Sequence, residues 1–178
     1  MLRPALVGLA LVASSAPAFA GVYLGLGVGS SPSVGKDAGQ YMTPDSRSGR
    51  ILAGYRFGHI SIEGEGIGFG ANSQRCDCDV YQLAASVKYS LPLSAGFEAF
   101  GKLGLEHMSW NQNGDGYDWS GNGYGGAAGL EYRFSVALTS ASIFVDYEIH
   151  HATLSHDANP VTMGLTPRMF TLGLTLGL

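Results

Sequence analysis

The last residues of the chain alternate strictly between large apolar and very small side chains. In RMFTLGLTLGL, residues 168–178, Phe or Leu occupies every second position from Phe170 onward, and Thr or Gly lies between them. Successive side chains of a β-strand point to opposite faces of the sheet. The pattern therefore predicts a strand with one bulky apolar face and one face of small residues.

Seven earlier segments show the same period of two, and no segment after residue 20 shows helical periodicity. They span residues 22–29, 50–57, 59–66, 81–91, 97–107, 124–134 and 143–150. Together with the C-terminal segment they predict eight strands, each near the length that crosses a bilayer at a tilt. Ile67 and Phe69 fall on the polar face, so we expect a bulge or an early end of the third strand there.

The charged residues within these strands all share a face with glycine, alanine and serine. They are Arg50, Arg56, Glu63, Glu65, Lys88, Glu98, Lys102, Glu106, Glu131, Arg133, Asp146 and Glu148. Inside a narrow barrel, small residues leave space for a few long charged side chains, which are stable there when they pair. We therefore assign the charged face to the interior and expect Lys102 to pair with Glu98, Glu106 and Glu131.

Composition favours a membrane barrel over a secreted soluble one. Only 13% of the residues are charged, whereas about a quarter is usual for soluble proteins. Polar segments near residues 30–48, 70–79, 109–122 and 153–167 alternate with short connections near Gly58, Ser94 and Ala137. Short turns at one end and long loops at the other are typical of outer-membrane barrels.

Aromatic residues lie near the predicted strand ends. Tyr55, Phe57, Tyr89, Phe97, Tyr132 and Phe134 lie near the short turns, and Tyr81 and Tyr124 lie near the long loops. We expect them to form the two interfacial girdles of a membrane protein. A soluble barrel would explain the alternation but not the girdles.

The first twenty residues have the features of a cleaved signal peptide. Arg3 precedes a short apolar run, and the segment ends in Ala18-Phe19-Ala20, the small-x-small pattern of a cleavage site. We therefore predict a signal peptide over residues 1–20 and one barrel domain over residues 21–178. Loss of Arg3 takes the formal net charge from −4 to −5, so we expect no nucleic-acid partner.

Several motifs resemble the small outer-membrane β-barrel family. They are GVYLGLGVG at residues 21–29, AGYRF at 53–57, KLGLE at 102–106 and GLEYRF at 129–134. This family includes the OmpA-type membrane domain, OmpX-like proteins and opacity-type surface proteins. The resemblance implies an all-β fold, an eight-stranded antiparallel up-and-down transmembrane β-barrel. It also implies the outer membrane of a Gram-negative-type envelope, with short turns in the periplasm and long loops outside the cell.

The resemblance also bears on partners and activity. It implies contact with outer-membrane lipid and lipopolysaccharide, with periplasmic chaperones and with the barrel insertion machinery, and an extracellular ligand on the long loops. We expect a monomer without cofactors and without enzymatic activity, in a structural and surface-exposed role such as adhesion or envelope integrity. Because eight strands leave a lumen filled by side chains, a wide pore is excluded. A narrow ion-conducting channel is the alternative, and a lipid A-modifying enzyme ranks third.

Three predicted loops carry residues that could form a disulfide, bind a metal ion or take part in catalysis. Cys76 and Cys78, in RCDCD, predict a disulfide in an oxidising compartment; metal capture with Asp77 and Asp79 lacks a further His or Cys. In the loop NQNGDGYDWSGN, positions 111, 113, 115 and 116 match the spacing of a calcium loop. Asn122 replaces its final Glu, so a Gly/Asn-rich surface loop is the preferred interpretation.

The segment EIHHATLSHDANP, residues 148–160, contains the only enzyme-like residues. His150-x-Ala152 lacks the nucleophile of a His-x-Ser pair, and His151-x-Thr153 offers a threonine without an obvious orienting Glu. Ser155, His156 and Asp157 are adjacent, and adjacent residues rarely point toward one another as a triad requires. We therefore expect these histidines to be solvated or at the barrel rim.

Overall fold

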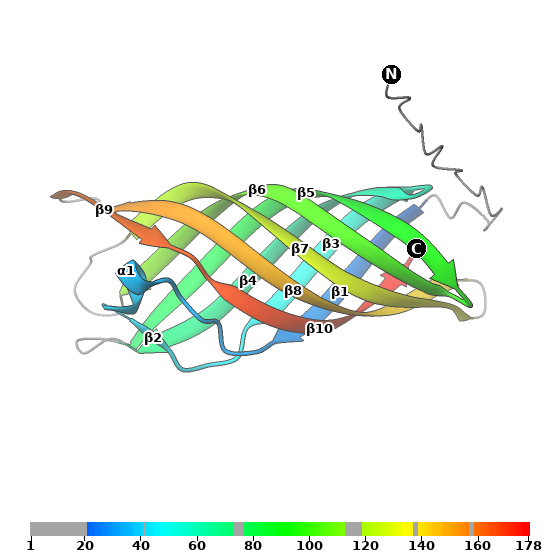
Figure 1. Cartoon of the computed structure of the whole chain (residues 1–178), viewed down its shortest axis with the longest axis horizontal. Coiled ribbons are helices and arrows are strands. Elements are labelled where there is room, and N and C mark those ends of the chain that lie inside the picture. The colour runs from blue at the N-terminus through cyan, green and yellow to red at the C-terminus, as the bar shows by residue number, and fades with distance from the viewer. Residues whose placement is uncertain (1–20, 41, 73–76, 113–118, 137–138, 157–158) are drawn as a thin grey trace, which may run out of the picture.

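The strands of the chain form one closed antiparallel barrel (Figure 1). This computed structural model describes residues 21–40, 42–72, 77–112, 119–136, 139–156 and 159–178. The elements are β1 (Gly21–Gly29), α1 (Lys36–Gly39), β2 (Thr43–Pro44), β3 (Gly49–Phe57), β4 (Ile60–Asn72), β5 (Asp77–Ser94), β6 (Phe97–Gln112), β7 (Trp119–Val136), β8 (Thr139–His156), β9 (Asn159–Leu165) and β10 (Arg168–Gly177). Within the described residues, no helix has the length and apolar character needed to span a membrane.

Eight strands make up the wall. Neighbours follow the order β10-β1-β3-β4-β5-β6-β7-β8-β9, and β10 also pairs with β8, which closes the ring. β9 and β10 both pair with β8 and are separated only by Thr166 and Pro167, so they act as one interrupted strand. Proline cannot donate a hydrogen bond to a neighbouring strand, which accounts for the interruption. The predicted eight-stranded antiparallel barrel is confirmed.

The two ends of the barrel differ. At one end, which we call the turn end, tight connections join β3 to β4 and β5 to β6. Gly58 and Gly96 adopt positive φ angles of 67° and 87° in these turns, a conformation that glycine adopts without strain. At the other end, the loop end, residues 30–48 carry α1 and β2.

Strands extend further toward the loop end than the sequence pattern predicted. β4 reaches Asn72, β6 reaches Gln112 and β8 reaches His156, so much of the predicted loops 70–79, 109–122 and 153–167 is strand. The expected bulge or early end after Glu65 is wrong, because β4 pairs with β5 without a register shift through Asn72. Ile67 and Phe69 instead point inward and are buried.

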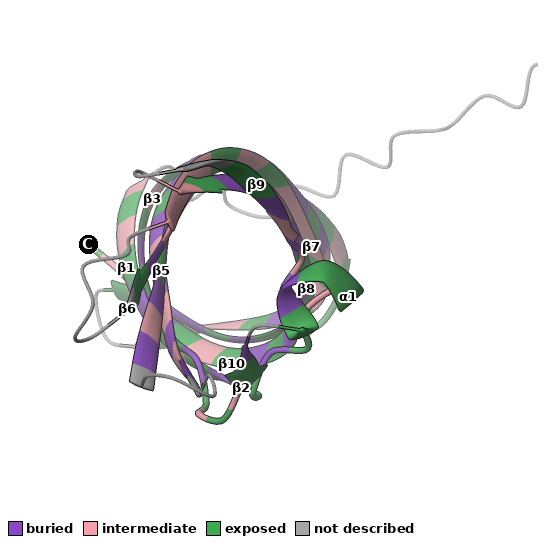
Figure 2. Ribbon diagram, turned by 90° about the vertical axis from the view of Figure 1, so that its left-hand side faces the viewer, coloured by how far each residue is buried: buried purple, intermediate pink, exposed green. Residues whose placement is uncertain are grey.

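The outer surface of the middle of the barrel is apolar. Leu103 and Leu105 on β6 are 76% and 74% exposed, as expected for side chains that face lipid. Near the turn end, Tyr55, Phe57, Tyr89, Phe97 and Tyr132 are exposed, and Phe134 is half-buried. Tyr81 and Tyr124 are exposed toward the other end. Figure 2 shows the strands closing into a ring, with more exposed and less exposed positions alternating along the wall.

The interior has two parts. Toward the loop end it holds an apolar cluster, the loop-end core. Its members are Ala38, Met42, Phe69, Ala71, Cys78, Val80, Met108, Trp110, Ala152, Leu154, Met163 and Leu165. The remainder of the interior is dominated by the charged residues described next.

Candidate functional site

The charged interior begins at the turn end with two arginines. The guanidinium of Arg56 on β3 donates two hydrogen bonds to the carboxylate of Glu98 on β6, at 2.9 and 3.0 Å. Arg133 Nη2 on β7 lies 3.3 Å from Glu98 and 3.2 Å from Glu131. Two arginines therefore share Glu98, and Arg133 links it to Glu131.

Two lysines continue the chain of ion pairs along the lumen. Lys88 Nζ donates to Glu131 at 2.6 Å and lies 3.6 Å from Glu63. Lys102 Nζ donates to Glu65 at 2.7 Å and lies 3.8 Å from Glu63. The expected partners of Lys102 were Glu98, Glu106 and Glu131, and that assignment is wrong. The lysine reaches β4, beyond its neighbouring strand β5, because the tilted wall of a narrow barrel brings non-adjacent strands together.

Arg50 on β3 is the next basic residue toward the loop end. Its guanidinium lies 2.9 Å from Asp146 and 3.6 Å from Glu65, and it also pairs with Glu148. All four side chains are almost fully buried. Arg50 therefore joins the β4 carboxylates to those of β8.

A histidine completes the series. His150 is buried, with Nε2 3.2 Å from Glu148 and Nδ1 2.8 Å from Glu106. Gln82 Nε2 donates to Glu106 at 3.0 Å and lies 2.8 Å from the His150 ring. The prediction that the histidines are solvated or at the rim is wrong for His150. Its parity with Asp146 and Glu148 on β8 was the signal for an interior position.

We call these twelve charged residues and His150 the ionic lumen. Every predicted member of the interior set is in it, and consecutive contacts link all of them. Tyr23 of β1 donates to Glu63 at 2.5 Å, and Thr171 of β10 donates to Glu148 at 2.6 Å. All eight strands of the wall therefore contribute to one polar network. The sequence reasoning missed Tyr23, Gln82 and Thr171, because a single hydroxyl or amide on the inner face carries no distinct pattern.

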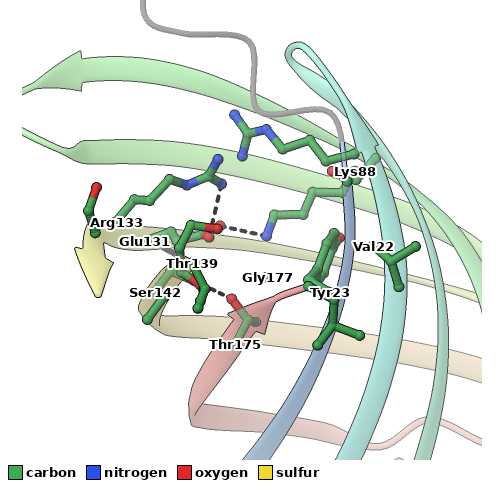
Figure 3. Close-up of a pocket in the computed structure, with 16 residues that line it drawn as sticks. Val22, Tyr23, Lys88, Glu131, Arg133, Thr139, Ser142, Thr175 and Gly177 are labelled. Atoms are coloured by element: carbon green, nitrogen blue, oxygen red, sulfur yellow. Dashed lines mark hydrogen bonds and ion pairs between the residues drawn. The ribbon is translucent and has the colours of Figure 1, made fainter. Parts of the chain in front are cut away.

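A polar pocket of about 230 Å³ opens at the turn end of the ionic lumen (Figure 3). Lys88 and Arg133 both point toward Glu131. Hydroxyl groups line another part, where Ser142 and Thr175 are hydrogen-bonded at 2.6 Å. The arrangement offers paired charges and hydroxyls, and within the described residues no group of three or more His, Cys, Asp or Glu side chains suits a metal ion.

The other candidate residues are dispersed. Cys78 is buried and disulfide-bonded, whereas Cys76 lies outside the described residues, so their pairing with each other stays a prediction. Of the calcium-like loop, residues 113–118 lie outside the described residues. Asn122 on β7 instead lies 2.9 Å from His107 Nδ1 on the outer surface.

The enzyme-like segment is described only in part. Ser155 and His156 are consecutive residues at the end of β8, where the pairing with β9 shifts register. Asp157 lies outside the described residues. His156 packs edge-on against Trp119, with ring centroids 5.0 Å apart, and His151 Nδ1 lies 3.0 Å from Thr166 Oγ1.

Comparison with known proteins identifies the family. A model of the outer membrane protein beta-barrel domain matches residues 4–176. The chain belongs to this family. It is therefore an outer-membrane β-barrel protein, as its motifs implied, and its localisation is the outer membrane of a Gram-negative-type envelope. No curated protein sequence matches it significantly.

Solved structures with this fold include two small outer-membrane barrels. Neisserial surface protein A (NspA) matches with a TM-score of 0.63 and 14% identity, over 88% of this chain and 97% of NspA. The N-terminal barrel domain of Pseudomonas aeruginosa OprF matches with a TM-score of 0.58 and 12% identity, over 89% of this chain and 98% of that domain. At such low identity, these matches support the fold alone.

Proposed function

We propose that the protein is a non-enzymatic, surface-exposed structural barrel whose lumen does not conduct ions. One observation carries the proposal: buried side chains occupy the interior from the ionic lumen to the loop-end core. Val80, Met108, Leu154 and Leu165 are fully buried in the loop-end core, and the ionic lumen lies beneath them. An ion would have to pass both an apolar layer and a set of paired charges.

Planar-bilayer recording tests this proposal against a narrow channel, the second candidate. The polar pocket at the turn end is the observation that favours a channel, because it admits water to the first ion pairs. We expect no single-channel conductance from the wild-type protein. We also expect no conductance from either single variant, Lys102→Met in the ionic lumen or Trp110→Ala in the loop-end core. Conductance in the wild type would overturn the proposal.

The proposal places the loop end outside the cell and the turn end in the periplasm. The chain has three lysines, and two of them, Lys88 and Lys102, are buried in the ionic lumen, whereas Lys36 on α1 is exposed. A membrane-impermeant amine reagent on intact cells should therefore label Lys36, as read by mass spectrometry. A Lys36→Arg variant provides the control. Labelling of Lys36 only after the outer membrane is permeabilised would reverse the orientation.

Two further elements of the proposal have their own tests. Residues 1–20 are proposed as the signal peptide, which is supported by the small-x-small pattern Ala18-Phe19-Ala20 directly before Gly21. N-terminal sequencing of the membrane-inserted protein should begin at Gly21. Mass spectrometry of lipid A from cells with and without the gene should show no difference, and a gene-dependent change would favour the enzyme interpretation.

A further inference from the structure

The loop end carries a second pocket, of about 450 Å³, which is distinct from the ionic lumen. This volume lies within the range of pockets that bind small molecules. Its lining residues come from α1 and the residue after it, the start of β7, the end of β8, and β9. They are Asp37, Gln40, Trp119, His156, Val161, Thr162, Met163 and Gly164.

The walls of this pocket are held by the loop-end core. Ala38 on α1 and Met42, which donates a backbone hydrogen bond to Ala38 at 3.0 Å, are both members of that core. Met163 of the pocket is buried in the same core. The short helix is therefore anchored beside β9, as Figure 1 also shows.

Trp119 gives the pocket an aromatic platform. Its ring is stacked on buried Trp110, with centroids 6.1 Å apart and 22° between the planes, and His156 packs against it edge-on. These contacts fix the indole while the side chain remains partly exposed and lines the pocket. A rigid aromatic side chain supplies contact area at little entropic cost.

The chemistry of the lining points to an uncharged ligand with an apolar face and hydroxylated edges. Asp37, Gln40 and Thr162 supply hydrogen-bonding groups, whereas Trp119, Val161 and Met163 supply apolar contact. Among the described residues, the lining contains no lysine or arginine, and the carboxylate of Asp37 repels an anion. We propose that this pocket binds an uncharged saccharide unit, with the sugar ring against Trp119 and its hydroxyls bonded to Asp37 and Gln40.

The saccharide proposal rests on the surface exposure of the loop end proposed above, but its test does not. The full chain is refolded in phosphocholine micelles, which carry no sugar head groups, and its tryptophan fluorescence is titrated with maltose and with cellobiose. We expect a saturable change with at least one disaccharide. Glucose 6-phosphate should bind at least about tenfold more weakly, which corresponds to about 1.4 kcal/mol.

A pair of glycine substitutions locates the site. A Cβ at Gly164 would lie 3.6 Å from Asp37 Oδ2, an ordinary contact, so Gly164→Leu should fold and fill the space between β9 and α1. We expect it to weaken binding about tenfold or more. Gly101→Leu is the matched control, because a Cβ there has no atom within 4 Å, and it should bind like the wild type. Gln40→Ala, which removes one hydrogen-bonding group, should weaken binding roughly three- to tenfold.

Three results would overturn the proposal. They are no saturable response to either disaccharide, equal binding by Gly164→Leu and the wild type, or a response to N-acetyl-phenylalaninamide without any response to sugars. The last result would assign the pocket to an apolar side chain of a protein partner. Labelling of Lys36 on intact cells tests surface exposure separately, so failure of the orientation and failure of the sugar site are distinguishable.

Discussion

The barrel reverses its polarity along its own axis. In the middle, β6 directs Leu103 and Leu105 outward and Lys102 and Glu106 inward. Toward the loop end the same strand directs Met108 and Trp110 inward, and exposed Asn111 lies on the outer face. β8 changes in the same way after His150.

This comparison shows how one continuous sheet is stable in two surroundings, lipid around its middle and water around its loop end. Where lipid surrounds the wall, polar groups are placed inside and must satisfy one another. Where water surrounds the wall, apolar groups are placed inside, as in a soluble protein. The reversal lies between Glu65 and Ile67 on β4, and between Glu106 and Met108 on β6. These positions mark the level at which we expect the wall to leave the hydrocarbon.

Removal of a charge from the ionic lumen should have the largest effect. Lys102→Met removes the cation that Glu65 and Glu63 share in a buried site. Each carboxylate then keeps only a cation 3.6 Å away, Arg50 and Lys88 respectively, and we expect the free energy of unfolding to fall by about 3–5 kcal/mol. Chemical denaturation in lipid vesicles measures this. The double variant Lys102→Met/Glu65→Gln should lose less than the single variant. If the single variant is as stable as the wild type, the lumen charges are independently hydrated.

Truncation in the loop-end core should cost nearly as much, for a different reason. Met108 is fully buried among apolar side chains, so Met108→Ala leaves a cavity and should cost about 2–5 kcal/mol. The isosteric change Met108→Leu should cost less than about 1.5 kcal/mol, measured by the same denaturation experiment. Equal stability of the alanine variant would mean that the loop-end core is not packed.

A charge on the outer surface should lower the free energy of unfolding only on the turn-end side of the level at which the polarity of the wall reverses. Leu103→Arg places a cation in the hydrocarbon and should lower the free energy of unfolding in bilayers by about 2–4 kcal/mol. Asn111→Arg lies on the same strand and face, eight residues nearer the loop end, and should change stability by less than about 0.5 kcal/mol. A similar cost at both positions would place the membrane boundary elsewhere.

The ion pairs at the turn end should contribute least. Arg133 is 19% exposed at the side chain, and Glu98 keeps its two hydrogen bonds from Arg56 when Arg133 is removed. We expect Arg133→Ala to cost about 1 kcal/mol or less, and high salt to reduce the difference between variant and wild type. A loss as large as that of Lys102→Met would show that the pocket at the turn end excludes water.

The alternation of side chains was sufficient to predict the strands, their faces and the twelve residues of the ionic lumen. It did not predict the strand ends near the loop end. There the apolar residues face inward, so Phe69 does not fit a pattern in which apolar residues face outward to lipid. It also failed for the partners of Lys102. Those partners depend on the tilt and closure of the barrel, which bring β6 to β4 across the lumen, and neither quantity is encoded in local spacing. His150 lay in the predicted strand 143–150, on the face of Asp146 and Glu148. It was still expected at the rim, because it also belongs to the histidine-containing segment that was interpreted as a loop.

The series of ion pairs has a consequence for the order of assembly. Arg50 lies in the second wall strand, but its partner Asp146 follows 96 residues later, in the seventh. Contacts so distant in sequence form slowly, since much of the chain must be arranged before they bring any gain. Until then the lumen charges need water as their partner. We therefore expect the unclosed sheet to hold a wet inner face, and the last hairpin to expel that water as it seals the barrel.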